Sequence, residues 1–251
     1  MNLTFLRYVV CLFALGVLGL STASLAEAAQ ADEILEKSDR IRFPKHDFQV
    51  DVNITTTEPG RDPDLHKYRI LSKGNEDSLV MTLYPASERG QILLMKRRDL
   101  WLYLPNVSQA VRLPLSQRLT GMVAYGDLAR ANFLGDYDPT LLRTEEVNGA
   151  NHHVLELNAV DRSVTYHRVI YWVNAANDRP YKAEFYTVSG RLMKTAFYEN
   201  FQEMAGELRP TRLVMINALR EGEQSVLEYD DMQLKKLEDK IFTKGYLKKL
   251  Q

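Results

Sequence analysis

Cysteine is almost absent from this sequence. Of its 251 residues only Cys11 is a cysteine, and it lies within the first apolar stretch, which has the features of a removable leader. The mature chain would then carry no thiol. Disulfide bonds, thiolate catalysis and cysteine-based metal sites are therefore excluded. An exported chain without disulfides must be held by its hydrophobic core, and about 220 residues are enough to bury one.

Net charge and long apolar runs are scarce as well. The 32 lysines and arginines nearly balance the 33 aspartates and glutamates, for a net charge of −1. A chain with so little positive charge has no global field that would attract nucleic acid. Beyond the first thirty residues there is no second long apolar run, so we expect the mature protein to be soluble.

The first thirty residues have the pattern of a secretory signal peptide. Arg7 provides a positive start, Tyr8–Leu20 is apolar and uncharged, and Ala26–Ala28 fits the small-residue rule for cleavage. The apolar run is shorter than the roughly 20 residues that a transmembrane helix needs, which favours a cleaved leader over an uncleaved anchor. We expect residues 1–28 to be a signal peptide, residues 31–251 to form one domain, and the protein to be exported.

Most of the mature chain alternates apolar and polar residues with a period of two. After an amphipathic helix predicted over 31–43 and ended by Pro44, the segment 47–55 alternates in this way, as a half-buried strand does. Similar segments follow at short intervals, joined by turns, which predicts an antiparallel meander. About a dozen strands are too many for a flat sheet. We therefore predict a mainly β fold with some helix, in which a curved antiparallel meander forms an incomplete β-barrel.

One segment interrupts this pattern, and we call residues 112–137 the insertion. Ser116 is predicted to cap a first short helix, and Asp127 to cap a second helix over 128–134 that ends at Gly135. Two short amphipathic helices cannot bury their apolar faces alone, so we expect them to close the concave side of the sheet. Two interpretations stay open: a lid that moves at glycines, or a fixed cap that completes the core. The tail, residues 240–251, is also predicted to be helical.

The predicted strands and the insertion contain many large apolar side chains that could line a hydrophobic cavity. Methionine is suited to this role because its flexible side chain adapts to irregular partners. The alternative is that these side chains pack only against one another. The candidates for lining the cavity or forming the lid are Val50, Val52, Met81, Leu83, Leu94, Trp101, Tyr103, Met122, Val123, Leu128, Phe133, Phe185, Met193, Phe197 and Met215.

The sequence contains no constellation of catalytic residues. It lacks the nucleophile elbow, the phosphate-binding loop, the dinucleotide fingerprint and the zinc-protease motif. His152, His153 and Glu156 do not amount to a metal site, because only one histidine shares a strand face with the carboxylate and zinc needs three or four ligands. We expect no catalytic residue, metal or cofactor. Three arginines lie inside strands and would need an anionic partner if they pointed inward: Arg69, Arg168 and Arg212.

Several separate blocks resemble one known family. These are the segment from Trp101 to Tyr137, "AEFYTVSGRLMKTAFYENF", "RPTRLVMINAL", "SVLEYDDM" and the tail "FTKGYLKKL". In this order they are similar to the outer membrane lipoprotein-sorting proteins of diderm bacteria, the LolA-like group, and in particular to the branch often found beside exporter genes. The resemblance covers nearly the whole mature chain and implies a LolA/LolB-type half-barrel closed by helices.

The resemblance also implies a function. A member of this group would bind acyl chains of lipoproteins or other lipids in its cavity and move them across the periplasm toward the outer membrane. An inner-membrane exporter or an ABC-type releasing complex would be a second partner, and we expect a monomer that binds no nucleic acid. The alternative is a lipid-binding adaptor or sensor that docks on an inner-membrane exporter or signalling protein. No functional residue of the dedicated lipoprotein carrier can be aligned here, so none is assigned.

Overall fold

The computed structural model describes residues 27–247 except residues 75, 106 and 108. The signal peptide predicted for residues 1–28 therefore lies outside the described residues apart from its last two. Within the described part of the chain, no helix is both long and apolar enough to cross a membrane.

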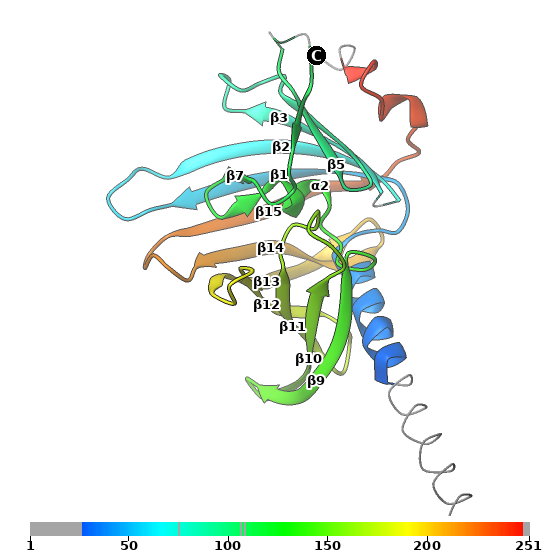
Figure 1. Cartoon of the computed structure of the whole chain (residues 1–251), viewed down its shortest axis with the longest axis vertical. Helices are drawn as coiled ribbons and strands as arrows, with labels where there is room; N and C mark the ends of the chain where they lie inside the picture. Colours follow the sequence, from blue (N-terminus) through cyan, green and yellow to red (C-terminus); the bar gives the residue numbers. More distant parts are fainter. Residues whose placement is uncertain (1–26, 75, 106, 108, 248–251) are drawn as a thin grey trace, which may run out of the picture.

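The dominant element is one antiparallel sheet of thirteen strands, in the order β6-β5-β4-β3-β2-β1-β15-β14-β13-β12-β11-β10-β9 (Figure 1). Its strands are β1 (Phe48–Thr57), β2 (Asp64–Lys73), β3 (Asp77–Tyr84), β4 (Ile92–Lys96), β5 (Asp99–Tyr103), β6 (Val111–Leu113), β9 (Tyr137–Val147), β10 (Ala150–Ala159), β11 (Arg168–Asn174), β12 (Pro180–Tyr186), β13 (Leu192–Met204), β14 (Glu207–Asn217) and β15 (Gln224–Leu234).

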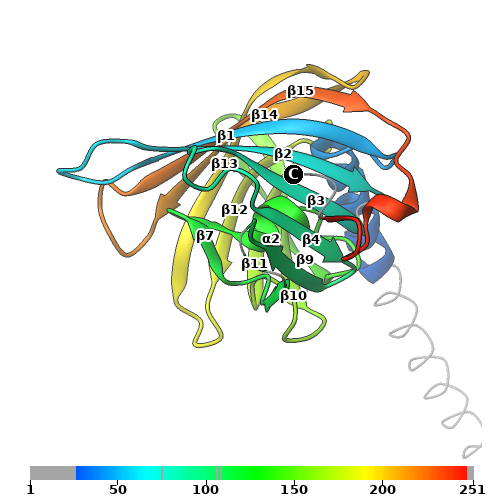
Figure 2. The same cartoon turned by 90° about the horizontal axis from the view of Figure 1, so that it is seen from above.

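The strand order explains how the sheet stays open. Consecutive strands of the sheet pair with each other except β6 and β9, and the first strand, β1, also pairs with the last, β15, in the middle of the sheet. The two edges are therefore β6 and β9, which are consecutive strands of the large sheet joined by the insertion. The sheet curves around α2 (Tyr125–Ala129) without its edges pairing (Figure 2). The prediction of an incomplete antiparallel barrel is confirmed.

The insertion differs from its prediction. The first predicted helix is instead a small hairpin of β7 (Arg118–Thr120) and β8 (Val123–Ala124). Gly121 supplies the turn with a φ of 48°, a conformation that glycine adopts easily. The predicted second helix is also wrong: α2 ends at Ala129, before most of the expected range. Asp127 lies inside α2, where its carboxylate accepts a hydrogen bond from the Ala124 N–H at 2.8 Å.

Residues 27–42 form the N-terminal helix, as the periodicity predicted. Its Ile34, Leu35 and Ser38 are buried on the face that the sequence indicated. In the part that the structure describes, the tail is less helical than expected and includes a short 3₁₀ turn, Asp239–Ile241. Phe242 and Leu247 of the tail are nevertheless fully buried. The tail lies on the opposite side of the sheet from α2 (Figure 1).

The sequence pattern does not predict strand β9, because Asp138 and Pro139 are residues typical of a turn. Both residues lie within β9 and pair with β10. Proline is tolerated here because β9 is an edge strand, where one side of the backbone needs no sheet partner. The charged residues of β9 alternate without a strong apolar face, so the strand gave little signal.

Candidate functional site

The candidate site is the inner face of the sheet, the concave surface against which α2 and the N-terminal helix pack. One hydrophobic cluster joins the helix, both halves of the sheet and the insertion. Leu35, Val52, Leu128, Tyr171 and Phe185, at least one from each of these parts, are all at most 4% exposed. Burying such side chains stabilises the fold by about 1.5–3 kcal/mol each. The insertion is therefore part of the core of the structure as it stands.

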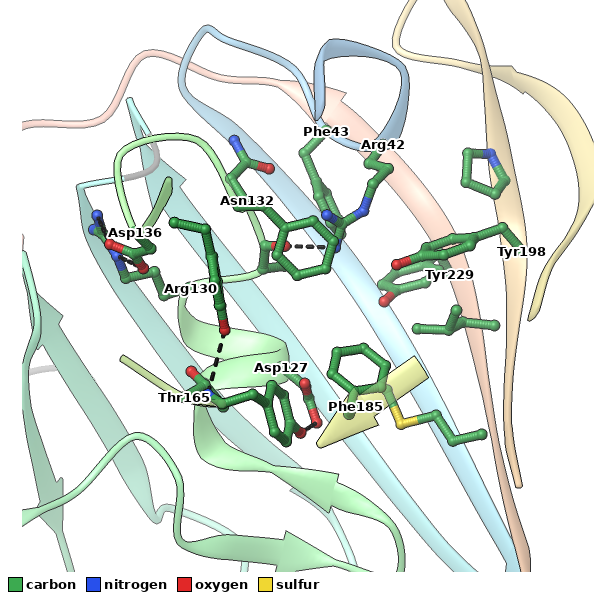
Figure 3. Close-up of a pocket in the computed structure, with 18 residues that line it drawn as sticks. Arg42, Phe43, Asp127, Arg130, Asn132, Asp136, Thr165, Phe185, Tyr198 and Tyr229 are labelled. Carbon is green, nitrogen blue, oxygen red and sulfur yellow. Dashed lines mark hydrogen bonds and ion pairs between the residues drawn. The ribbon is translucent and has the colours of Figure 1, made fainter. Parts of the chain in front are cut away.

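The space beneath the insertion is nearly filled. A cavity of about 30 Å³ remains between α2, the N-terminal helix and strands β12 to β15, which is room for about one or two water molecules. Figure 3 shows Arg42, Asp127, Phe185 and Tyr198 around it. An acyl chain does not fit into this conformation, so any cargo of that size requires the insertion or the helix to move.

The N-terminal helix is fastened to the insertion by hydrogen bonds from two of its buried charged residues, which also pair with each other. The Asp39 carboxylate lies 3.0 Å from the Arg42 guanidinium and also accepts hydrogen bonds from the backbone N–H groups of Phe133 and Leu134, at 2.9 and 2.7 Å. Arg42 in turn donates to the carbonyl of Ala131 and stacks over the Phe133 ring at 4.3 Å. Burial raises the pKa of Asp39, against the opposing effect of Arg42.

A second buried ion pair fastens α2 to the sheet. The Lys194 ammonium of β13 lies 2.9 Å from the Asp127 carboxylate and donates to the Met122 carbonyl at 2.8 Å. Asp127 also accepts a hydrogen bond from the Tyr166 hydroxyl at 2.7 Å. Burial lowers the pKa of Lys194, and Asp127 partly offsets this. Charged groups this deep in an apolar face are costly unless they are paired.

A third cluster fixes the end of the insertion. The Asp136 carboxylate, 2% exposed, pairs with Arg130 at 2.5 Å and with Arg98 at 2.8 Å. Arg98 also pairs with Asp161 at 2.7 Å and donates to the carbonyl of Gly135. The insertion is thus held at three points by charged groups as well as by its apolar contacts.

Two of the three glycines of the insertion allow its close approach to the rest of the fold. A Cβ on Gly121 would lie 2.2 Å from the Thr56 hydroxyl and 2.3 Å from the Ser225 hydroxyl, and one on Gly126 would lie 2.0 Å from the Thr165 hydroxyl. Real side chains do not tolerate such distances. These glycines therefore have a packing role in this conformation, whether or not they also act as hinges.

The structure brings a first group of the predicted site residues together on the inner face. They lie in the inner-face cluster or pack against it: Val50, Val52, Met122, Val123, Leu128, Phe133, Phe185 and Met215.

A second group lies on the outer face. Leu94 and Tyr103 belong to a separate cluster with the tail residues Phe242 and Leu247, and Met81 and Trp101 pack against it. By alternation along β3, Leu83 lies on the same side as Met81. Strands β3 to β5 are apolar on both faces because the tail covers the outer one, and their pattern could not reveal which face is concave.

Met193 and Phe197 are placed on the outer face too, which corrects the predicted inner face of β13. Lys194, Ala196 and Tyr198 point inward instead and are buried. A charged residue normally faces water, so the alternation in this strand predicts Lys194 outside and Met193 and Phe197 on the inner face. Lys194 points inward because Asp127 provides its partner. Because side chains alternate between the two faces of a strand, placing Lys194 on the wrong face also places all the remaining residues of the strand on the wrong face.

The charged residues of the inner face were the functional candidates that sequence reasoning missed. The sequence pattern did not single out Arg42 or Asp39, and it placed Lys194 on the outer face. The available signal was weak: a single lysine between apolar neighbours in "RLMKTAF", and a carboxylate, Asp127, beside small and apolar residues.

The polar residues that the sequence did single out have protein partners. Each of the three strand arginines pairs with a carboxylate on an adjacent strand: Arg69 with Asp51, Arg168 with Glu156 and Arg212 with Glu199. The His152 ring lies 2.9 Å from the Ala150 carbonyl, and the His153 ring 3.0 Å from the Thr144 hydroxyl. Partners within the protein therefore meet the charge and hydrogen-bonding requirements of these side chains without a ligand.

Comparison with solved structures places the fold among known proteins. A LolA superfamily protein from Nitrosomonas europaea is 62% identical, with a TM-score of 0.83, and the alignment covers 86% of this chain and 98% of the other. A DUF1329 family protein from Desulfovibrio piger is 20% identical, with a TM-score of 0.75 and coverage of 88% and 99%. A putative outer membrane lipoprotein-sorting protein domain from Vibrio parahaemolyticus is 24% identical, with a TM-score of 0.72 and the same coverage.

The last two similarities concern the fold alone. A family model with the description "Uncharacterized protein" matches residues 74–249, and no curated protein matches the chain. The open half-barrel, the helical cover and the high identity over nearly the whole of a solved relative agree with one another. The chain belongs to the LolA superfamily.

Proposed function

We propose that this protein is a periplasmic carrier that binds the acyl chains of lipoproteins or lipids on its inner face and moves them toward the outer membrane. The observation that carries the proposal is the architecture of the inner face: a large apolar surface on an open sheet, covered by an insertion that joins the two sheet edges. We further propose that residues 1–28 are a signal peptide, that residues 31–251 act as one domain, and that the protein works without enzymatic chemistry.

In this proposal the structure corresponds to the empty, closed state, because the cavity between α2, the N-terminal helix and strands β12 to β15 measures about 30 Å³. Loading displaces the insertion, and the acyl chain takes over its apolar contacts. A chain of about fifteen methylenes gains about 12 kcal/mol on burial. Breaking one buried ion pair costs about 3–5 kcal/mol. The gain is large enough to open one such contact, and the remaining contacts would return the insertion when the cargo leaves.

The test is whether the protein carries lipid in its host. The mature chain should be purified without detergent and examined by native mass spectrometry, with solvent extraction to identify what it holds. We expect a fraction of the molecules to carry one or more acyl chains. A protein that is always empty, and that takes up no lipid from vesicles, would contradict the proposal.

The filled interior also favours a second candidate, a lipid-binding adaptor or sensor that docks on an inner-membrane exporter or signalling protein. Such a protein would spend most of its time closed. It would be distinguished by stable capture of a membrane partner without any transfer of lipid between vesicles, whereas a carrier transfers lipid without needing a stable partner.

A further inference from the structure

Lys194 has an unusual position for a lysine. It lies in β13 with its side chain on the inner face and is 1% exposed. Its ammonium donates to two oxygen atoms, the Met122 carbonyl at 2.8 Å and the Asp127 carboxylate at 2.9 Å. Its other surroundings are apolar or aromatic: the ammonium lies 4.8 and 5.0 Å from the ring centroids of Tyr166 and Phe185.

Three other cations that meet the insertion would keep a carboxylate if the insertion moved. Arg42 pairs with Asp39, which lies on the same N-terminal helix. Arg130 and Asp136 both belong to the insertion and would move together. Arg98 would lose Asp136, but its second partner, Asp161, lies outside the insertion.

Lys194 is different, because both of its oxygen partners belong to the insertion while the lysine itself belongs to the sheet. Displacing the insertion removes the Asp127 carboxylate and the Met122 carbonyl in one step. The ammonium would then stand among aromatic side chains and the Met215 sulfur, 3.2 Å away. Burial already lowers the pKa of Lys194, and Asp127 is the group that opposes this. An ammonium left there without an anion is strongly unfavourable.

We infer that the cargo is an amphiphile with an anionic head group, a phosphate or a carboxylate, which replaces Asp127 as the partner of Lys194 while its acyl chain covers the inner face. The small cavity lies at this point, since Asp127, Tyr166, Phe185 and Met215 line it as well as surrounding the ammonium. The inference rests on the proposed carrier function and adds the class of head group. Under this inference Lys194 has two roles: it pairs with Asp127 in the empty protein, and it selects the head group of the cargo when the protein is loaded.

The experiment compares three probes with the same twelve-carbon chain on the delipidated mature protein: laurate, dodecyl phosphate and the neutral ester monolaurin. Binding is measured by isothermal titration below the concentration at which the probes form micelles. We expect the wild type to bind at least one anionic probe about tenfold or more tightly than monolaurin. The anion that binds more tightly identifies the source of the charge as phosphate or carboxylate.

The decisive variant is Lys194→Met, which removes the charge and keeps an unbranched side chain. It should lose the preference for the anionic probes and keep its affinity for monolaurin. The matched control is Lys182→Met, which makes the same change in net charge at an outer-face lysine paired with Glu184. This control should bind all three probes as the wild type does.

If Lys194→Met does not fold, Asp127→Asn answers the same question, because it frees the cation instead of removing it. Its ratio of anionic to neutral affinity should rise about tenfold. Equal binding of the three probes by the wild type, or an unchanged ratio in the variants, overturns the inference and leaves the carrier function standing. Failure of all three probes to bind overturns both.

Discussion

At the scale of single residues, the inner face carries tyrosines in an environment where the phenolate is disfavoured. Burial raises the pKa of these hydroxyl groups above the ordinary value of about 10. In Tyr166 and Tyr198 the nearby carboxylate of Asp127 acts in the same direction. The affected residues are Tyr68, Tyr137, Tyr166, Tyr171, Tyr198 and Tyr229.

These tyrosines predict a loss of stability in alkali. Above about pH 10 a tyrosine in the unfolded chain loses its proton while the folded one keeps it. The unfolded state then binds fewer protons, so the free energy of unfolding decreases as the pH rises, by about 1.4 kcal/mol per pH unit for each such tyrosine. Below pH 10 this contribution is fully present. Urea unfolding followed by circular dichroism at increasing pH measures the slope.

The variant Tyr198→Phe tests the assignment, because it removes one buried hydroxyl and keeps the ring. Above pH 10 the free energy of unfolding should then decrease less steeply with pH than in the wild type, by about 1.4 kcal/mol per pH unit, because one ionisable group fewer contributes to the slope. A slope identical to that of the wild type would mean that this tyrosine is not protected from ionisation in the folded state.

Residue roles were the hardest to predict from the sequence. Gly121 and Gly126 were expected to weaken helices and act as hinges, whereas a side chain at either position would overlap the rest of the fold. Nothing near them in the sequence indicates that closeness, since the atoms concerned belong to Thr56, Ser225 and Thr165. Likewise Lys194 could not be placed inside without knowing that Asp127 lies opposite.

At the scale of secondary structure, the insertion and the N-terminal helix are coupled through Asp39. This carboxylate neutralises Arg42 and accepts the backbone N–H groups of Phe133 and Leu134. The variant Asp39→Ala leaves a buried guanidinium and two buried donors without these partners. We expect it to lower the free energy of unfolding by about 3–5 kcal/mol and to speed hydrogen exchange in residues 130–137.

The matched control is Glu36→Ala on the same helix. Glu36 pairs with Arg40 on the exposed face, and such a pair contributes about 0.3–0.5 kcal/mol. If the two variants were equally stable, or if exchange in the insertion did not change, the helix would not be holding the insertion.

Elements with a clear period were predicted well, and the reason is physical. The half-buried strands and the N-terminal helix each have one solvent-exposed face and one buried face, which produces the periodic pattern of polar and apolar residues in the sequence. The segment 117–124 was predicted to be a helix because its apolar residues fit helical spacing, but a turn at Gly121 makes it a hairpin. Short apolar runs do not separate these two structures. Strand β9 was not predicted because it is an edge strand that contains a proline and lacks a regular alternation of apolar residues.

At the scale of the whole molecule, the strand order determines where the protein can open. The pairing of β1 with β15 unites the two halves of the sheet along its middle, so the open side lies between β6 and β9. The insertion that connects these edges is also the cover of the inner face. A meander that curls was predictable from strand number and short connections, but the pairing of the first and last strands is long-range and leaves no local pattern.

The most direct measurement locks the insertion to the loop between β10 and β11. A Cβ at Gly126 would lie 3.0 Å from the Thr165 Cβ, about 0.5 Å closer than the shorter separations in disulfides, so the loop must give by that amount to accept the bond. Thr165→Cys also removes the hydroxyl group that leaves no room for a side chain at Gly126. The mature chain would have no other cysteine, so Gly126→Cys with Thr165→Cys can form only this bond within the molecule. Lipid uptake from vesicles is then compared before and after reduction. The account predicts that the oxidised protein takes up no lipid and that reduction restores uptake, whereas equal uptake in both states would contradict it.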